Sequence, residues 1–215
     1  MAVALIAGAT GLVGNLLLDQ LLSGEDYTQV IAVSRKPLNR SHAKLINRVV
    51  DFDHLDAQAH ELKADDIFCC LGTTIRQAGS QEAFRKVDHE YPLQLARLTK
   101  QQGARQFLLI TAMGSDKSSS IFYNRVKGEV EEAIGNVGFE AFHIFQPSML
   151  LGDRIEQRAG ESVGKKVMLA LDFLIPKKYK AIEAIRVARG MYQVALRRQP
   201  GRHIHDSAEL QDFVS

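Results

Sequence analysis

Apolar residues along this chain gather in short unbroken runs that alternate with longer segments of helical spacing. The runs Ile67 to Leu71 and Phe107 to Ile110 contain no charged residue, which is typical of strands covered on both faces of a parallel sheet. Their regular alternation with helices predicts a doubly wound, Rossmann-type α/β fold with a mostly parallel sheet. The expected strands are 2–7, 29–34, 46–50, 66–71, 105–111, 139–146 and 202–205, and the expected helices are 12–23, 54–62, 80–101, 119–135, 161–174, 182–198 and 207–213.

Two signals refine the element boundaries. Pro92 interrupts the pattern of residues 80–101, so we expect a kink there or a later helix start near Asp88. Asp206, with Glu209 three positions on, predicts a capped last helix. The 215 residues fit a single domain, 1–215. Within it we expect residues 152–215 to form a small C-terminal helical cap on the substrate side, with a closing strand and helix.

The most informative segment is the glycine turn between the first strand and the first helix. Gly8 permits a tight turn, Gly11 lets the backbone approach a pyrophosphate, and Gly14 lets the helix lie close to the strand. The free N–H groups of the first helical turn and the helix dipole would then attract phosphate. The segment therefore predicts a dinucleotide site, against the alternative of an ordinary loop with three permissive residues.

The end of the second strand bears on the choice of dinucleotide. NAD-preferring folds usually carry an Asp or Glu about 20 residues after the glycine turn, which binds the ribose 2′-OH. This chain has Ser34, Arg35 and Lys36 there, a hydroxyl and two cations suited to a 2′-phosphate. We therefore expect NADP(H) to be preferred over NAD(H), the alternative being a solvated basic turn. Asp51, after the third strand, is placed either to meet the adenine edge or to cap a helix.

A candidate catalytic pair follows the fifth strand. Tyr123 and Lys127 are four residues apart on a helix that Ser119 or Ser120 could cap, so their side chains lie on one face. A phenol exchanges its proton poorly at neutral pH unless a neighbouring ammonium favours the phenolate. The same ammonium could bind the nicotinamide ribose. The spacing alone could arise by chance, and its place after the fifth strand of a nucleotide-binding sheet gives it weight.

Composition narrows the class of protein further. Hydrophobic residues at 46% and charged residues at 24% are typical of a folded globular chain, with neither a transmembrane segment nor a secretory leader expected. Adjacent Cys69 and Cys70 would point to opposite faces of a strand, which suits a reducing cytoplasm. His203 and His205 share a strand face without a third ligand, so no metal site is expected. The motifs of P-loop nucleotide hydrolases and of α/β-hydrolases are missing.

Basic residues are in excess near the C-terminus. Residues 152–202 contain 12 Lys and Arg against 5 Asp and Glu. This favours either solvated helix faces or contact with an anionic substrate, a membrane surface or an acidic protein partner. The few aromatic residues of this segment do not form a pattern that suggests stacking on bases, so nucleic acid is not an expected partner. The basic positions nearest the expected substrate side are Arg154, Arg158, Lys165 and Lys166.

The motifs together resemble those of one family. The chain is similar to the atypical short-chain dehydrogenase/reductases, in the branch of the Tat-interacting tumour-suppressor oxidoreductases and their bacterial relatives. Similarity runs from the first strand to about Arg154 and weakens beyond it. Besides the glycine turn, the segments that carry it are Val50–Asp53, Phe68–Thr74, Arg85–Asp88, Asp116–Ser119 and Tyr123–Glu131.

This resemblance implies an NADP(H)-binding fold and, in catalytic members, a Ser/Thr-Tyr-Lys set for carbonyl or hydroxyl redox chemistry. Tyr123 would donate or accept the proton, Lys127 would favour the phenolate form of Tyr123, and Thr111 or Ser115 would orient a substrate oxygen. Ala112 stands where catalytic members have their serine, and Gln146 stands where they have Arg in an Arg-Pro-Gly segment. The expected cofactor-binding residues are Gly8, Thr10, Gly11, Leu12, Val13, Ser34, Arg35, Lys36, Asp51, Phe52, Cys70, Leu71, Gly72, Thr73, Tyr123, Lys127, Pro147, Ser148 and Met149.

Two functions follow from these expectations. The first is an NADP(H)-dependent oxidoreductase, a monomer or small homo-oligomer, that acts on a small carbonyl or hydroxyl substrate. The second is a catalytically weak or inactive NADP(H)-binding regulatory protein that engages a protein partner. The retained Tyr123/Lys127 pair favours the first, and Ala112 favours the second.

Overall fold

The computed structural model describes residues 2–152 and 176–214. Seven parallel strands form one sheet in the order β3-β2-β1-β4-β5-β6-β9, so the Rossmann-type fold is confirmed. The strands are β1 (Ala2–Ala7), β2 (Tyr27–Ser34), β3 (Leu45–Val49), β4 (Asp66–Cys69), β5 (Gln106–Ile110), β6 (Ala141–Gln146) and β9 (Gly201–Asp206). A separate two-stranded ladder joins β7 (Leu150–Leu151) to β8 (Ile182–Glu183).

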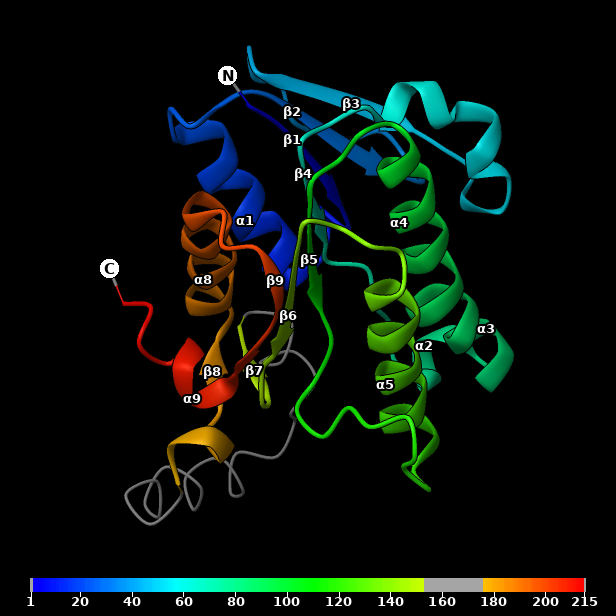
Figure 1. Ribbon diagram of the computed structural model, residues 1–215, viewed down its shortest axis with the longest axis vertical. Helices are drawn as coiled ribbons and strands as arrows, with labels where there is room; N and C mark the ends of the chain where they lie inside the picture. The colour runs from blue at the N-terminus through cyan, green and yellow to red at the C-terminus, as the bar shows by residue number, and fades with distance from the viewer. Residues whose placement is uncertain (1, 153–175, 215) are drawn as a thin grey trace.

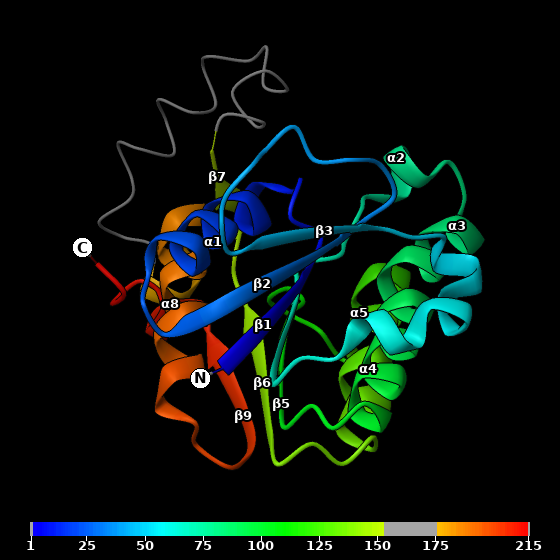
Figure 2. The same cartoon turned by 90° about the horizontal axis from the view of Figure 1, so that it is seen from above.

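Helices cover both faces of this sheet (Figures 1 and 2). On one face α1 (Leu12–Ser23) packs beside α8 (Ala184–Arg197), and both contribute to one apolar core. On the other face α4 (Tyr91–Gln101) and α5 (Phe122–Gly135) enclose a second core. The shorter helical segments are η1 (Phe52–Leu62), α2 (Ile75–Ala78), α3 (Gln81–Arg85), η2 (Lys86–Glu90), η4 (Lys177–Tyr179) and α9 (Ser207–Leu210).

Several expected boundaries are corrected. The segment expected as helix over 54–62 is the 3₁₀ segment η1, and the one over 80–101 is divided into α3, the π-turn η2 and α4. Pro92 has no N–H to continue the hydrogen-bond ladder, which explains the disruption near Asp88. Helix α5 begins at Phe122 without a side-chain cap, three residues later than expected. The helix expected over 161–174 lies outside the described residues, as do Arg154, Arg158, Lys165 and Lys166.

Two local predictions are confirmed. Asp206 caps α9 by accepting a hydrogen bond of 2.9 Å from the N–H of Glu209. Cys69 packs in the core on the α4/α5 face, whereas Cys70 packs against the core on the α1/α8 face, and both thiols are free. Burial raises the pKa of the Cys69 thiol to about 12, so this cysteine is a packing residue rather than a nucleophile.

Candidate functional site

The glycine turn joins β1 to α1 at the point where the sheet order reverses, between β1 and β4. Gly8 has φ +87°, and a Cβ there would lie 2.4 Å from the carbonyl oxygen of Cys70. A Cβ on Gly14 would lie 2.2 Å from the carbonyl oxygen of Gly8. Only glycine fits at either position, because the backbones of β1, α1 and the loop after β4 approach within side-chain distance.

The start of α1 fits an anionic ligand. Among the described residues, its first turn contains no acidic residue, and its N-cap Gly11 provides no side-chain acceptor for the first N–H groups. A Cβ on Gly11 would lie 3.2 Å from the carbonyl oxygen of Gly8, so this position also leaves little room for a side chain. The open N–H groups and the helix dipole suit a pyrophosphate. The expected positions Thr10, Leu12 and Val13 lie in this turn.

The end of β2 differs from expectation in one residue. Ser34 is buried, and its hydroxyl donates to the carbonyl oxygen of Lys36 at 2.7 Å and accepts from the Asn47 amide at 2.8 Å. Its hydrogen bonds are therefore used within the protein, which argues against Ser34 as a phosphate ligand. Arg35 and Lys36 are exposed at the strand end, as a site for a 2′-phosphate requires.

Asp51 acts as a helix cap in this structure. Its carboxylate accepts the N–H of Asp53 at 2.9 Å and contacts the His54 ring at 2.9 Å. The hydrogen bond from His54, followed by that from Asp53, lowers the pKa of Asp51. The neighbouring Phe52 is buried, with its ring 5.2 Å from that of Tyr91. The capping role expected for Asp51 is confirmed, and its contact with the adenine edge stays a prediction.

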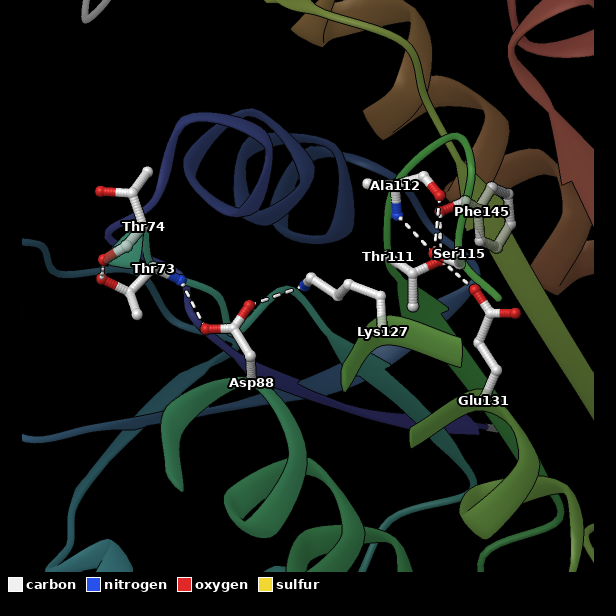
Figure 3. Close-up of polar contacts among 9 residues, drawn as sticks. All are labelled: Thr73, Thr74, Asp88, Thr111, Ala112, Ser115, Lys127, Glu131 and Phe145. Carbon is white, nitrogen blue, oxygen red and sulfur yellow. Dashed lines mark hydrogen bonds and ion pairs between the residues drawn. The ribbon is translucent and has the colours of Figure 1, made fainter. Parts of the chain in front are cut away.

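A buried ion pair, not anticipated from the sequence, lies beside the loop after β4 (Figure 3). The Lys127 ammonium is 2.7 Å from one carboxylate oxygen of Asp88, and the other oxygen accepts the N–H of Thr73 at 2.9 Å. The side chains of Asp88 and Lys127 are 0% and 6% exposed. Because Asp88 lies in the π-turn η2, the widened turn aims its carboxylate at α5. Asp88 thus links Lys127 to the Leu71–Thr74 loop.

Tyr123 and Lys127 are brought to the same face of α5, as the spacing predicts. The Tyr123 side chain is half-buried, with its ring centroid 5.4 Å from that of Phe84. Burial lowers the pKa of Lys127, but the charges of Asp88 and Tyr123 and the hydrogen bond to Asp88 outweigh it, so the pKa is raised. Lys127 is therefore a stable ammonium, and burial conversely raises the pKa of Asp88 against the effect of Lys127.

A second buried carboxylate, Glu131, lies one turn further along α5 (Figure 3). It accepts the Thr111 hydroxyl at 2.5 Å and the Gln146 side-chain amide at 3.0 Å. Ser115 donates to the carbonyl oxygen of Ala112 at 2.7 Å. Both hydroxyls expected to orient a substrate, those of Thr111 and Ser115, are therefore engaged in contacts within the protein.

The segment after β6 is fixed by contacts to earlier and later parts of the chain. The carbonyl oxygen of Pro147 accepts the N–H of Met113 at 2.9 Å. The Ser148 hydroxyl donates to the carbonyl oxygen of Lys180 and accepts from Ser207 at 2.9 Å. Met149 is half-exposed. The three expected positions Pro147, Ser148 and Met149 thus lie at the carboxyl edge of the sheet, with the Ser148 side chain directed to the protein.

His143 on β6 and His205 on β9 form a hydrogen-bonded chain with Glu209. The ring of His205 contacts that of His143 at 3.0 Å and the carboxylate of Glu209 at 2.8 Å, while His203 bonds the carbonyl oxygen of Pro200. Within residues 2–152 and 176–214, no group of three His, Cys, Asp or Glu is arranged to hold a metal ion. In the same part of the chain, no helix is long and apolar enough to cross a membrane.

Comparison with known proteins agrees with this geometry. A family model described as NAD(P)H-binding matches residues 8–158. Protein HTATIP2 of Rattus norvegicus is 37% identical over 190 residues, which cover 86% of this chain and 78% of that protein. Protein FMP52, mitochondrial, of Coccidioides immitis is 30% identical over 212 residues, which cover 91% of this chain and 86% of that protein.

Solved structures share the fold at low identity. MoeE5 in complex with UDP-glucose and NAD matches with a TM-score of 0.72 and 15% identity, over 96% of this chain and 79% of that one. A short chain dehydrogenase family protein from Francisella tularensis matches with a TM-score of 0.70 and 14% identity, over 95% of this chain and 96% of that one.

Proposed function

This chain belongs to the NAD(P)H-binding family, in the HTATIP2 branch of the atypical short-chain dehydrogenase/reductases. From this premise we propose that it is an NADP(H)-dependent oxidoreductase of small carbonyl or hydroxyl compounds. The observation that carries the proposal is the shared face of α5, on which Tyr123 is followed by the buried, ion-paired Lys127. A pyridine nucleotide supplies or accepts the hydride in such chemistry.

The glycine turn, Arg35 and Lys36 are the residues that would hold the nucleotide. Backbone N–H groups at the start of α1 suit the pyrophosphate, and the two exposed cations suit the dianionic 2′-phosphate of NADP(H). No carboxylate stands at the end of β2 to bind a ribose 2′-OH. MoeE5, which shares the fold, is described with NAD, so the preference for NADP(H) rests on this chain's own residues.

Tyr123 would donate a proton to the substrate oxygen during reduction, or remove it during oxidation. Lys127, held as an ammonium by Asp88, would favour the charged phenolate that remains after donation. Asp88 acts as a positioning residue because it fixes both the Lys127 ammonium and the Thr73 N–H. The internal contacts of Thr111 and Ser115 leave Tyr123 as the group proposed to orient the substrate oxygen.

The test has two parts. A fluorescence titration with NADPH and NADH in parallel should give tighter binding of NADPH, and Arg35→Asp should remove the difference. Consumption of NADPH against a panel of small aldehydes and ketones then identifies turnover. Tyr123→Phe should abolish turnover and leave NADPH binding nearly intact, because only the proton-carrying hydroxyl is removed. Unchanged turnover in this variant would refute the proposed role of Tyr123.

A second function is favoured by one observation. Ala112 replaces the serine of catalytic members, and both neighbouring hydroxyls are engaged elsewhere. A nucleotide-binding regulatory protein would need no substrate-orienting hydroxyl. Capture of a protein partner that follows NADPH concentration, without NADPH consumption, would support this function. The fungal relatives carry the word mitochondrial in their names, and a cytoplasmic location for this chain stays a prediction.

A further inference from the structure

The loop between β2 and β3 forms an arch beside the glycine turn, held at three points. At its start the Ser34 hydroxyl bonds the carbonyl oxygen of Lys36. In its middle the N–H of Leu38 donates to the Asn47 side chain at 2.8 Å, and the same amide donates to Ser34. Two residues further on, Arg40 forms an ion pair with Asp19 on α1. The arch is thus held by contacts within the protein.

Beneath this arch lies a cavity of about 500 Å³ that reaches the glycine turn. Its walls come from three parts of the chain, namely the turn itself, the outer side of α1 and the loop. The lining residues are Ala9, Thr10, Asn15, Leu18, Asp19, Leu38, Asn39 and Arg40. The cavity therefore opens next to the glycine turn, and one of its walls is the loop that continues from Arg35 and Lys36.

The charges around the cavity are unequal. Of the charged residues that line it, Arg40 and Asp19 are bound to each other, and the loop that forms one wall of the cavity begins with two further exposed cations, Arg35 and Lys36. The remaining charge of two matches a phosphate monoester, which is close to a dianion at pH 7 to 8. Arg40 lines the cavity itself, and its planar guanidinium can bind a phosphate through two parallel N–H groups.

The geometry points to Arg40 and Asp19 as an opposed pair that sets cofactor specificity, with Arg40 binding the 2′-phosphate of NADP(H) and Asp19 competing for it. This inference rests on the proposed function and assigns residues beyond Arg35 and Lys36. Asp19 lies on the second turn of α1, and its carboxylate is paired with Arg40 at the wall of the cavity. Removing Arg40 should weaken the binding of the phosphorylated nucleotide, whereas removing the Asp19 charge should strengthen it.

Binding titrations of NADPH and NADH to the full-length protein test this pair without any assay of turnover. Arg40→Ala should weaken NADPH binding about tenfold, because a charged hydrogen bond to phosphate is lost, and should change NADH binding less than about twofold. Asp19→Asn should tighten NADPH binding about threefold, since an exposed ion pair competes only weakly. Arg48→Ala serves as the control, because it removes a comparably exposed arginine of β3 that is paired with Glu61. This variant should leave the affinities for NADPH and NADH unchanged.

The outcomes separate this inference from the proposed function. If the wild-type protein binds both nucleotides equally, the NADP(H) preference is wrong, and the inference fails with it. If NADPH is preferred but Arg40→Ala weakens NADPH and NADH alike, the pair only holds the loop, and the specificity role is overturned. An Asp19→Asn variant that weakens NADPH binding would overturn the competition between carboxylate and phosphate.

Discussion

Two regions at the carboxyl edge of the sheet are built in opposite ways. The β1–α1 turn is made by the main chain, since Gly8 and Gly14 let backbones meet and no side chain in the described part of the chain caps the helix. The facing side of α5 is made by buried side chains, with Lys127 paired to Asp88 and Glu131 bound to Thr111.

The difference separates binding from chemistry. A turn of backbone N–H groups offers partial charges that no change of pH can remove, which suits a phosphate under all conditions. A buried ammonium depends on its carboxylate partner and changes with each substitution nearby. The first region therefore tolerates almost no change of shape, and the second tolerates almost no change of charge.

The largest effect is expected where a buried charge loses its partner. Asp88→Ala leaves the Lys127 ammonium in the core without a carboxylate, so the free energy of unfolding should fall by about 3–5 kcal/mol. Denaturant unfolding measures this loss. Lys127→Met in the same protein should recover part of it, because the unpaired charge is then gone. A loss below about 1 kcal/mol for Asp88→Ala would mean that water already reaches the pair.

In the β1–α1 turn, the space around the backbone limits which residues fit. Two glycines separate the cost of a steric clash from the cost of backbone strain. Gly8 and Gly79 both have left-handed backbones, with φ +87° and +88°, but a Cβ on Gly79 meets nothing within 4 Å. Gly79→Ala should therefore cost only the conformational strain of about 1–2 kcal/mol. Gly8→Ala adds a clash with the backbone of Cys70, so we expect a total of about 3 kcal/mol and loss of NADPH binding. Thermal unfolding measures the loss of stability, and the NADPH titration measures the loss of binding. Equal losses of stability in the two variants would contradict the close approach of Gly8 to the backbone of Cys70.

The same contrast explains what the sequence could reveal. The β1–α1 turn consists of seven consecutive residues, so its strand, glycines and helix are visible as a local pattern. The i, i+4 spacing likewise brought Tyr123 and Lys127 to one face. The apolar runs also predicted the order of helices and strands, and with it a doubly wound parallel sheet, which the structure has.

Contacts between distant residues carried no such signal. Asp88 and Lys127 are joined through a π-turn, whose extra residue shifts every following side chain around the helix. The engagement of Ser34 depends on Asn47 in the neighbouring strand, and that of Thr111 on Glu131 in α5. A hydroxyl at the expected sequence position can therefore form its hydrogen bonds within the protein instead of to a ligand, and only the packed structure reveals this.

The smallest effect expected concerns the second buried carboxylate and its dependence on pH. Burial raises the pKa of Glu131, and the hydrogen bonds from Thr111 and Gln146 only partly offset it. The folded protein thus holds this proton more tightly than the unfolded chain does. The stability that Glu131 contributes is therefore fully present below the pKa of the unfolded chain and is lost as pH rises through the folded pKa.

Glu131→Gln removes this titration while keeping the shape of the side chain. At about pH 4 the wild-type protein should be more stable than the variant by about 1 kcal/mol, because a protonated carboxyl satisfies both neighbours better than an amide does. This gap should shrink as pH rises to about 8. His143, whose pKa burial and the neighbouring histidines lower to about 4, titrates in both proteins and cancels from the difference. Gly79→Ala, measured over the same range, should show a constant gap, because strain in the backbone carries no proton. A gap for Glu131→Gln that is equally constant would place Glu131 with the backbone-built region, where shape alone decides stability.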